Sequence, residues 1–463
     1  MGIIQKFKQW LAEPIDGRVL GLFRLVFGLF MAYEAYVYYR MGLIDQGLLA
    51  PKVLFKYDGL GWLHPISKPV MLVALGVMGV SGLLIAAGWF FRWACWLFAL
   101  SLSFIFFQEK SYYNNHIYLF ILLGILLSFT QADRFMSWRK NAYSSGMPVV
   151  ARWQQFIFQA QIIIVYFYGG ITKLKSDWLF RQEPIRSMAE TMPSSHLMAP
   201  FVKSEFAIHA LTYGGLLLDL LAPLLLWHKQ VRRWALLPFV GFHLANSRIF
   251  SDIGIFPYVM LASLILFFET REIPWLRRLV KTPAQAPASK KTKQKDPQTT
   301  ASILPAENPL STPRWVAYAL AVYFAFQLLF PFRGFFLPNN MDWTGIGKNF
   351  AWRMKVDTRA LEAFEVTIHH PTTGQVMPVE VLTFVNQMQV LNMTLDVRSV
   401  AAFARAMKEV AAERGVPNAI VKARIMVRYN GRHAQLFVNP DVDLASVTYS
   451  PFKKLDWVIP LNK

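Results

Sequence analysis

The sequence predicts a mostly helical, polytopic membrane protein with about nine transmembrane helices and a C-terminal extracytoplasmic α+β domain. Composition is the first reason, because 54% of the 463 residues are hydrophobic and 15% aromatic, whereas only 16% are charged. The second is that apolar runs approaching the roughly 20 residues needed to cross a bilayer recur through most of the chain. The third is that these runs stop near residue 332, and shorter alternating patterns typical of soluble strands follow.

Nine apolar runs define the predicted spans. They cover residues 18–38, 69–90, 93–108, 115–132, 153–173, 205–227, 233–250, 253–269 and 315–332. The first run, which begins at Val19, is too long and bulky for a signal peptide, and no small-residue cleavage site follows it. We therefore expect it to stay in the mature protein.

Lysine and arginine gather in the N-terminal segment and in alternate connecting segments. These are Lys6, Lys8, Arg92, Arg134, Arg139, Lys140, Lys229, Arg232, Arg233 and the stretch from Arg271 to Lys295. Cytoplasmic loops carry such an excess, so a cytoplasmic N-terminus places all of them inside and residues 333–463 outside. The net charge of +20 then indicates positive-inside topology and contact with anionic membrane lipids. No nucleic-acid-binding motif occurs, and no nucleic-acid partner is expected.

Composition and spans divide the chain into four predicted parts. Residues 1–281 form an eight-span membrane domain, and residues 314–332 form the ninth helix. Between them, residues 282–313 are rich in Pro, Ala, Lys, Thr and Gln, which predicts a flexible, basic cytoplasmic linker because such a segment cannot bury a core. Residues 333–463 form the extracytoplasmic α+β domain.

Local patterns predict the elements of that domain. Residues 363–369 and 376–382 form two strands around a turn at residues 371–374. Asp396 is a candidate N-cap for a helix that carries apolar residues from Val400 to Val410 on one face and ends at Gly415. A strand over residues 423–429 follows, with Asn430-Gly431 as the turn into residues 433–438.

Cysteine and histidine usage argues against a metal site. The single cysteine, Cys95, lies inside a predicted span, so the external domain has no internal disulfide. The nine histidines are scattered, and the pair His369-His370 lacks ligand spacing. No H-E-x-x-H, C-x-x-C, Walker or dinucleotide-binding motif occurs. We predict no metal.

Lys173 has the setting that most suggests chemistry. It lies at the outer end of a long apolar segment, and Tyr166, the Gly169-Gly170 pair and Lys173 fall on one helical face. The amine is therefore expected beside a small-residue notch, deprived of water and available as a neutral base. Lys175, two residues further, points elsewhere and is expected to reach the membrane interface by snorkelling.

Polar residues inside the predicted spans are the next candidates, because each is costly in hydrocarbon. They are Arg24, Glu34, Gln155, Gln159, Gln161, His209, Asp219, His243 and Asn246. We expect most of them to join helices, as the Gln155/Gln159 pair would. Asn114, Asn115 and His116 open a span on the same side as Lys173, where they either cap the helix or hold a ligand oxygen.

The segment around Lys173 resembles the vitamin K-dependent γ-glutamyl carboxylases and their bacterial relatives. Their small-Gly-x-x-Lys-Leu-x-x-Asp-Trp motif is matched by Gly169, Gly170, Lys173, Leu174, Asp177 and Trp178. Further matches follow in the family's order: FRLVFG at residues 23–28, NNHIYL at 114–119, FHLANSRIF at 242–250, NPDVDL at 439–444, SPF at 450–452 and WVIPL at 457–461. The resemblance therefore extends along nearly the whole chain.

The resemblance implies a set of site residues. Lys173 and His116 are the predicted catalytic residues. The predicted cofactor contacts are Asn115, Tyr166, Gly170, His243, Asn246, Phe256 and Met354, the last within WRMK at residues 352–355. Lys173 would deprotonate the hydroxyl of a quinol held by the others.

The implied function is a γ-glutamyl carboxylase-like enzyme in the membrane. Reduced vitamin K, as phylloquinol or menaquinol, would react with O2 to give a strong base and leave as the epoxide. That base would remove the γ-proton of glutamate in a peptide or protein substrate, and CO2 would trap the carbanion. Two alternatives stay open, a quinol epoxidase that does not carboxylate and a non-catalytic quinone- or lipid-binding membrane protein. The compact length suggests a bacterial inner membrane, with the C-terminal domain in the periplasm, or in the ER lumen of a eukaryotic host.

Overall fold

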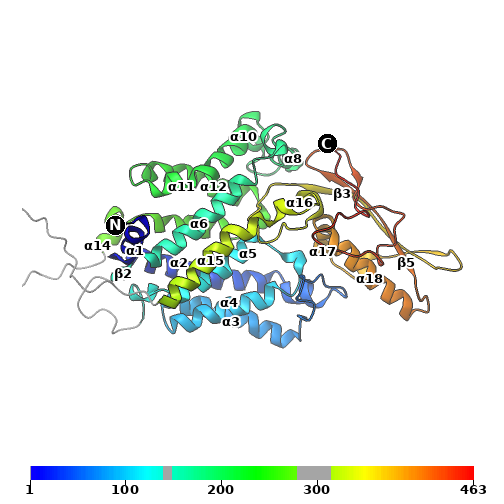
Figure 1. The fold of residues 1–463 in the computed structure, drawn as a ribbon, viewed down its shortest axis with the longest axis horizontal. Helices are drawn as coiled ribbons and strands as arrows, with labels where there is room; N and C mark the ends of the chain where they lie inside the picture. The colour runs from blue at the N-terminus through cyan, green and yellow to red at the C-terminus, as the bar shows by residue number, and fades with distance from the viewer. Residues whose placement is uncertain (1, 139–148, 279–313, 463) are drawn as a thin grey trace, which may run out of the picture.

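A computed structural model of the chain describes residues 2–138, 149–278 and 314–462. Long helices run side by side along the longest axis of the molecule, and a domain containing strands lies at one end of this bundle (Figure 1). The N-terminus lies at the opposite end. The linker predicted at residues 282–313 falls outside the described residues.

The helical body comprises all elements up to α15. Its helices are α1 (Ile3–Ala12), α2 (Arg18–Arg40), α3 (Lys68–Ala87), α4 (Phe91–Phe106), α5 (Asn115–Ser128), α6 (Trp153–Ile171), α7 (Ser176–Leu179), α8 (Ile185–Thr191), α9 (Ala199–Val202), α10 (Glu205–His209), α11 (Gly215–Trp227), α12 (Arg232–Ile249), α13 (Phe256–Leu264), α14 (Pro274–Arg278) and α15 (Arg314–Leu329). A two-stranded antiparallel sheet joins β1 (Pro14–Asp16) to β2 (Val149–Ala151).

A helix occupies each of the nine predicted spans, but the count of nine membrane crossings is not confirmed. In the described part of the chain, four helical stretches are long and apolar enough to cross a membrane: Arg18–Arg40, Lys68–Ala87, Glu205–Trp227 and Arg314–Phe336. The helices in the other predicted spans are too short or too polar to qualify as membrane-crossing helices. Helices α4, α5 and α13 are shorter apolar helices, whereas α6 contains four glutamines and α12 three arginines.

Small residues allow the helices of the body to approach closely. A Cβ atom at Gly82 of α3 would lie 2.7 Å from the backbone nitrogen of Ala32 in α2, so only glycine fits at this crossing. Behind these contacts, a continuous apolar core runs from Val19 in α2 to Val316 in α15. A second apolar cluster, with members from Trp178 to Ile249, joins helices α7 to α12.

Two hydrogen bonds inside the body fix helix α15 against it. Tyr323 donates to the side-chain oxygen of Gln161 in α6 at 2.6 Å, and Gln327 donates to the hydroxyl of Tyr118 in α5 at 2.8 Å. Such polar contacts specify orientation where apolar packing alone does not. The helix that leads into the C-terminal domain is thus held in register with the helices that precede it.

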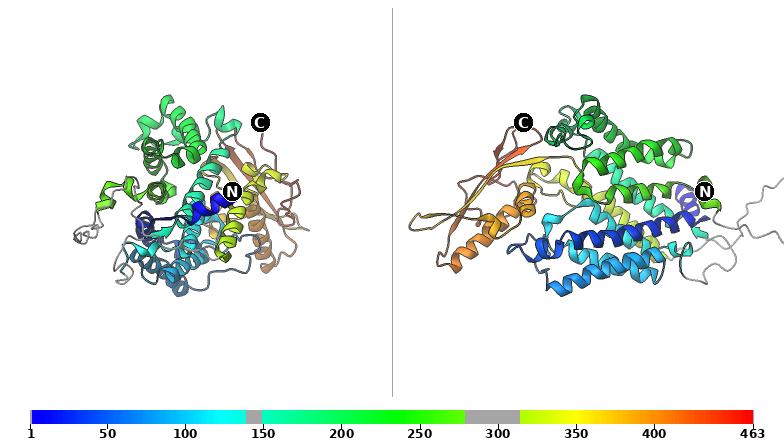
Figure 2. Two further views of the ribbon diagram at one scale, coloured as in Figure 1. Left: turned by 60° about the vertical axis from the view of Figure 1, so that its left-hand side comes forward. Right: turned by 180° about the vertical axis from the view of Figure 1, so that it is seen from behind.

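The C-terminal domain follows α15 and contains one sheet and two packed helices. Its elements are α16 (Met341–Thr344), β3 (Arg359–His369), β4 (Val376–Pro378), α17 (Gln387–Leu395), α18 (Val397–Glu413), β5 (Ile420–Tyr429) and β6 (Gln435–Leu436). The sheet order is β4-β3-β5-β6, with every neighbouring pair antiparallel. The C-terminal domain and its contact with the body are also visible from behind (Figure 2).

The expected helix and central strand of this domain are confirmed, and two details differ. Asp396 caps α18 by accepting from the backbone N–H of Arg398, and alternate residues of β5 from Val421 to Tyr429 are buried. The strand expected at residues 376–382 ends at Pro378 and continues as a 3₁₀ turn. Helix α17 was not predicted, because its amphipathic pattern is weak and the cap at Asn386 is its main local signal.

A loop of the body joins the C-terminal domain to it. The backbone N–H groups of Lys52 and Val53 donate to the carbonyl oxygen of Phe384, and Phe55 is completely buried in the core of the C-terminal domain. Glu109 accepts from the backbone N–H of Phe55 at 2.8 Å and from Gln389 at 3.0 Å. The helical body and the C-terminal domain therefore both contribute hydrogen-bonding groups to the contact between them.

Candidate functional site

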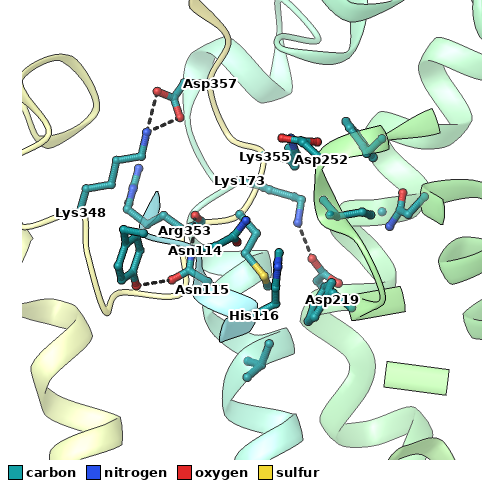
Figure 3. A pocket seen from close by; sticks show the side chains of 18 of the residues that line it. Asn114, Asn115, His116, Lys173, Asp219, Asp252, Lys348, Arg353, Lys355 and Asp357 are labelled. Atoms are coloured by element: carbon teal, nitrogen blue, oxygen red, sulfur yellow. Dashed lines mark hydrogen bonds and ion pairs between the residues drawn. The ribbon is translucent and has the colours of Figure 1, made fainter. Parts of the chain in front are cut away.

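A cavity of about 320 Å³ lies where the helical body meets the C-terminal domain (Figure 3). This volume lies in the range of small-molecule sites. The ends of α5, α6, α12 and α13 contribute residues, as do α11 and the segment of residues 345–357. Eight of the nine predicted site residues line it: Asn115, His116, Tyr166, Lys173, His243, Asn246, Phe256 and Met354.

Lys173 lies just beyond the last turn of α6, and its amine forms a buried ion pair with Asp219 of α11. The amine also donates to the carbonyl oxygen of Gly169 at 3.1 Å and lies 5.2 Å from the centre of the Trp178 ring. The amine is therefore not isolated as the sequence suggested, because three groups of the protein contact it.

The glycine notch beside Lys173 is filled by helix α11. A Cβ atom at Gly170 would lie 2.7 Å from the side chain of Leu220 and 2.9 Å from its backbone nitrogen. Gly170 is not among the residues that line the cavity. Its predicted contact with a cofactor gives way to a helix-packing position, because the small-residue face of α6 meets α11 there.

Tyr166 and His243 form a buried pair on one wall of the cavity. The tyrosine hydroxyl lies 2.6 Å from Nε2 of His243, and Nδ1 of that histidine has no hydrogen-bond partner among the described residues. Asn246 lines the same wall one helical turn further along α12. The wall therefore combines aromatic surface with polar groups that a ligand oxygen can use.

Asn115 is engaged within the protein. Its side-chain oxygen accepts from the Tyr113 hydroxyl, and its amide donates to the carbonyl oxygen of Arg353, both at 2.8 Å. The Tyr113 hydroxyl in turn accepts from the backbone N–H of Phe350 at 2.5 Å. This chain of hydrogen bonds holds the segment of residues 350–353 over the cavity (Figure 3).

His116 is the polar residue with the greatest freedom to bind a ligand. Its ring stacks on Phe256 with 5.7 Å between centroids, and across the described residues neither ring nitrogen has a hydrogen-bond partner. A buried imidazole with unused donor and acceptor capacity is costly unless a ligand or water completes it. The stacked pair thus offers an aromatic wall with a polar edge.

Ion pairs line the side of the cavity that faces the C-terminal domain. Lys348 contacts both carboxylate oxygens of Asp357 at 2.7 and 2.8 Å, and Lys355 contacts Asp252 at 2.5 Å. Burial would raise the pKa of Asp357, but the charges of Lys348 and Arg359 outweigh it and lower that pKa to about 2. Asp357 is therefore ionised at neutral pH, and this side of the cavity is polar.

Met354 completes the lining from the same segment. Its methyl carbon lies 3.8 Å from the position that a Cβ atom of Gly169 would occupy, so it reaches the surroundings of Lys173. Lys175, for which the sequence predicts snorkelling to the membrane interface, forms an ion pair with Asp342 of α16 at 3.2 Å.

Asp177, the acid of the Lys173 motif, contacts the C-terminal domain. Its carboxylate accepts two hydrogen bonds from Arg432 at 2.7 and 2.8 Å and one from Asn430 at 2.9 Å. The turn after β5 is thereby attached to the segment that carries Lys173. Sequence spacing gave no sign of this contact, because its partners are more than 250 residues apart.

Asp219 is one of the polar residues within the predicted spans, most of which we expect to be structural, and it is not among the predicted site residues. The signal available was that it is the one acidic residue in the predicted span 205–227 apart from Glu205 at its start. No pattern in the sequence links it to Lys173. Among the described residues, no cluster of three or more His, Cys, Asp or Glu side chains has the arrangement of a metal site.

Apolar helices that suit a bilayer, with an aromatic and polar cavity at one end, define an integral membrane protein with a small-molecule site. The HTTM domain family matches residues 12–271, and the lumenal domain of vitamin K-dependent gamma-carboxylases matches residues 312–463. The chain belongs to the vitamin K-dependent γ-carboxylase family. No solved structure matches it.

Proposed function

We propose that the protein is an enzyme that oxygenates a reduced naphthoquinone to its epoxide and uses the base formed to carboxylate glutamate in a peptide. The observation that carries this proposal is the convergence of Lys173, His116, Tyr166 and His243 on one cavity, together with Met354 from the second matched segment. Tyr166 and Lys173 come from α6 and the turn after it, whereas His116 comes from α5, His243 from α12 and Met354 from the segment of residues 345–357.

The residues present fit a reduced naphthoquinone such as phylloquinol or menaquinol. Such a ligand has a flat, apolar ring system with two oxygens. The cavity has aromatic walls and the imidazoles of His116 and His243, and Nδ1 of His243 is buried without a hydrogen-bond partner among the described residues. When bound, it would supply with O2 a base strong enough for the γ-proton of glutamate, which no side chain can remove at its own pKa. CO2 is the second co-substrate.

The protein's own part in this chemistry is binding, orientation and proton transfer. His116, His243 and Asn246 would hold the ring oxygens, and Phe256 and Met354 would pack against the ring. Lys173 would accept a hydroxyl proton. The polar side, with the Lys348–Asp357 pair, would face the peptide. The surrounding apolar helices would exclude water from the base.

A reconstitution experiment tests the proposal. Purified protein receives phylloquinol or menaquinol, a glutamate-containing peptide and labelled CO2, and both epoxide and peptide label are measured. We expect epoxide to form, with weak peptide labelling unless a partner or a specific recognition sequence is supplied. Robust labelling would rule out an epoxidase that does not carboxylate. Failure to form epoxide from any naphthoquinol would leave a binding protein without catalysis.

Variants of two neighbouring lysines provide the matched control. Lys173→Ala should abolish epoxide formation, because the proton acceptor is lost. Lys175→Ala should retain most of it, because Lys175 lies outside the cavity lining and its partly buried pair with Asp342 contributes little. Full activity of Lys173→Ala would contradict the assignment of Lys173 as the base.

A further inference from the structure

Asp219 is the feature of the cavity that the proposed chemistry leaves unexplained. Its side chain is 6% exposed and lies on α11, directly against the amine of Lys173. Gly169 has no side chain to block this approach, since a Cβ atom there would lie 2.9 Å from the Asp219 carboxylate. A carboxylate in a membrane helix is energetically costly, so such a residue is a candidate for a functional role.

The pair poses a problem for a base mechanism. The carboxylate of Asp219, the carbonyl of Gly169 and the ring of Trp178 all stabilise the ammonium form of Lys173. An ammonium has three donors and no electron pair with which to take a proton. Lys173 therefore needs to lose a proton before it can act.

We propose that Asp219 accepts a proton from Lys173 and so allows Lys173 to act as the base. This inference rests on the proposed function. It assigns proton transfer from the quinol to two residues together, Lys173 as the base and Asp219 as the group that first takes a proton from Lys173. Asp219 acts through Lys173 and does not itself contact the reacting atoms.

The proton steps balance. The N–H bond directed at Asp219 breaks, and an O–H bond forms on the carboxylate along the existing hydrogen bond. The electron pair left on Nζ then takes the hydroxyl proton of the quinol, whose oxygen keeps the bonding pair. The pair begins as ammonium and carboxylate. It ends as ammonium and neutral acid, so the positive charge of Lys173 lies beside the new negative charge of the ligand.

Other titratable groups line the same cavity. Tyr166 of α6, His116 of α5 and His243 of α12 belong to the helical body, and the Lys355–Asp252 ion pair joins η5 (Ser251–Ile253) to the segment of residues 345–357 (Figure 3). The remaining ones are Lys110, Tyr113, Lys348, Arg353, Asp357 and Asp396. The two histidines lack a carboxylate partner among the described residues. Asp219 is thus the acceptor that already has a hydrogen bond to Lys173.

Chemical modification of Lys173 tests the proposal without any quinol. Acetic anhydride reacts with neutral amines, so mass spectrometry of the Lys173 peptide across a pH series gives the pH of half-maximal acetylation. Asp219→Asn removes the counter-charge but keeps the shape, so this pH should fall by about 1–3 units. Quinol turnover at pH 7 should nevertheless fall about 100-fold or more, because the acceptor is gone.

The acetylation midpoint of Lys173 and the rate of quinol turnover together distinguish the alternatives. If Lys173 acts alone as a neutral base, Asp219→Asn makes it more available and turnover stays or rises, which would overturn the relay. An unchanged acetylation midpoint would overturn the ion pair itself. Wild-type protein that forms no epoxide would refute the proposed function instead, while the acetylation shift would still report on the pair.

Two more variants protect the test against misfolding. Asp219→Glu retains a carboxylate and should recover part of the turnover lost in Asp219→Asn, which a defect of packing would not do. Glu272→Gln breaks a comparably buried ion pair with Arg232, outside the cavity lining. It should leave both the acetylation midpoint of Lys173 and quinol turnover unchanged.

Discussion

At the scale of single residues, the two glycines before Lys173 have different tasks. Gly169 lets the carboxylate of Asp219 reach the amine, and its own carbonyl accepts from that amine. Gly170 lets the backbone of α11 approach α6 at Leu220. The family motif therefore describes a contact between two helices as much as a reactive lysine.

We expect Gly170→Ala to destabilise the fold without touching the cavity. The added methyl group would lie 2.9 Å from the backbone nitrogen of Leu220, which cannot rotate away, so α6 and α11 must separate. Overpacking of this kind typically costs about 1–3 kcal/mol, which should lower the midpoint of thermal unfolding in detergent. Gly241→Ala in α12 is the control, because its Cβ would meet no atom within 4 Å. An unaltered midpoint for Gly170→Ala would contradict the packing role.

Sequence reasoning named eight residues that line the cavity as site residues, but it did not find their partners. His243 stands out as a polar residue inside an apolar run and His116 as one at the start of a run, and the family resemblance marks them and Met354 as site residues. The engagement of Asn115 with Arg353 and of Lys173 with Asp219 depends on which helices become neighbours. The spacing of residues along one helix does not show which other helices will pack against it.

At the scale of elements, the short helix α7 connects the reactive lysine to the C-terminal domain. It begins three residues after Lys173 and contains Asp177, whose carboxylate is bound by Arg432 and Asn430. Burial would raise the pKa of Asp177, but the hydrogen bonds from Arg432 and Asn430 and the nearby positive charges outweigh it and lower that pKa. The link is thus an acid-sensitive one.

The turn at residues 430–432 should detach in acid. Because the folded-state pKa of Asp177 lies below its unfolded value of about 3.9, this link stabilises the fold above that pH and is lost as the pH falls further. The protection factor for hydrogen exchange in the peptide that covers the turn should therefore fall below about pH 4.

Arg432→Ala should give fast exchange in that peptide already at pH 7. Arg424→Ala, which removes an exposed ion pair with Glu365 from the same strand, should leave it slow. Exchange that stays slow in Arg432→Ala would show that other contacts hold the turn.

The predictability of elements followed the strength of their periodic signals. The nine apolar runs and the helix capped by Asp396 were visible because each signal is contiguous. Helix α17 escaped notice, and so did helices α7 to α9, because they are short and are stabilised by contacts made elsewhere in the fold. The number of membrane crossings stays a prediction, because glutamines in α6 and arginines in α12 weaken the signal there.

At the scale of the whole molecule, positive charge and the C-terminal domain lie at opposite ends. Lys229 and Arg232, at the connection between α11 and α12, pair with Glu269 and Glu272 beside α14. Helix α14 lies near the N-terminus and far from the C-terminal domain (Figure 1). This arrangement agrees with a cytoplasmic N-terminus and an external C-terminal domain.

Compartment-specific reporters test that topology. A reporter that works only outside the cytoplasm should be active when fused after Lys463, and inactive when fused to a chain truncated after Arg278. A cytoplasmic reporter should give the reverse pattern. Cytoplasmic activity at both positions would refute an odd number of crossings and the external position of the C-terminal domain.

The lining of the cavity extends along the chain from Lys110 to Asp396. During synthesis, the ribosome therefore completes every helix of the body well before the last wall of the cavity exists. Residues 345–357 supply part of its lining, and the C-terminal domain that follows them packs against the loop that carries Phe55. A chain that ends before residue 345 therefore has Lys173 beside an incomplete cavity.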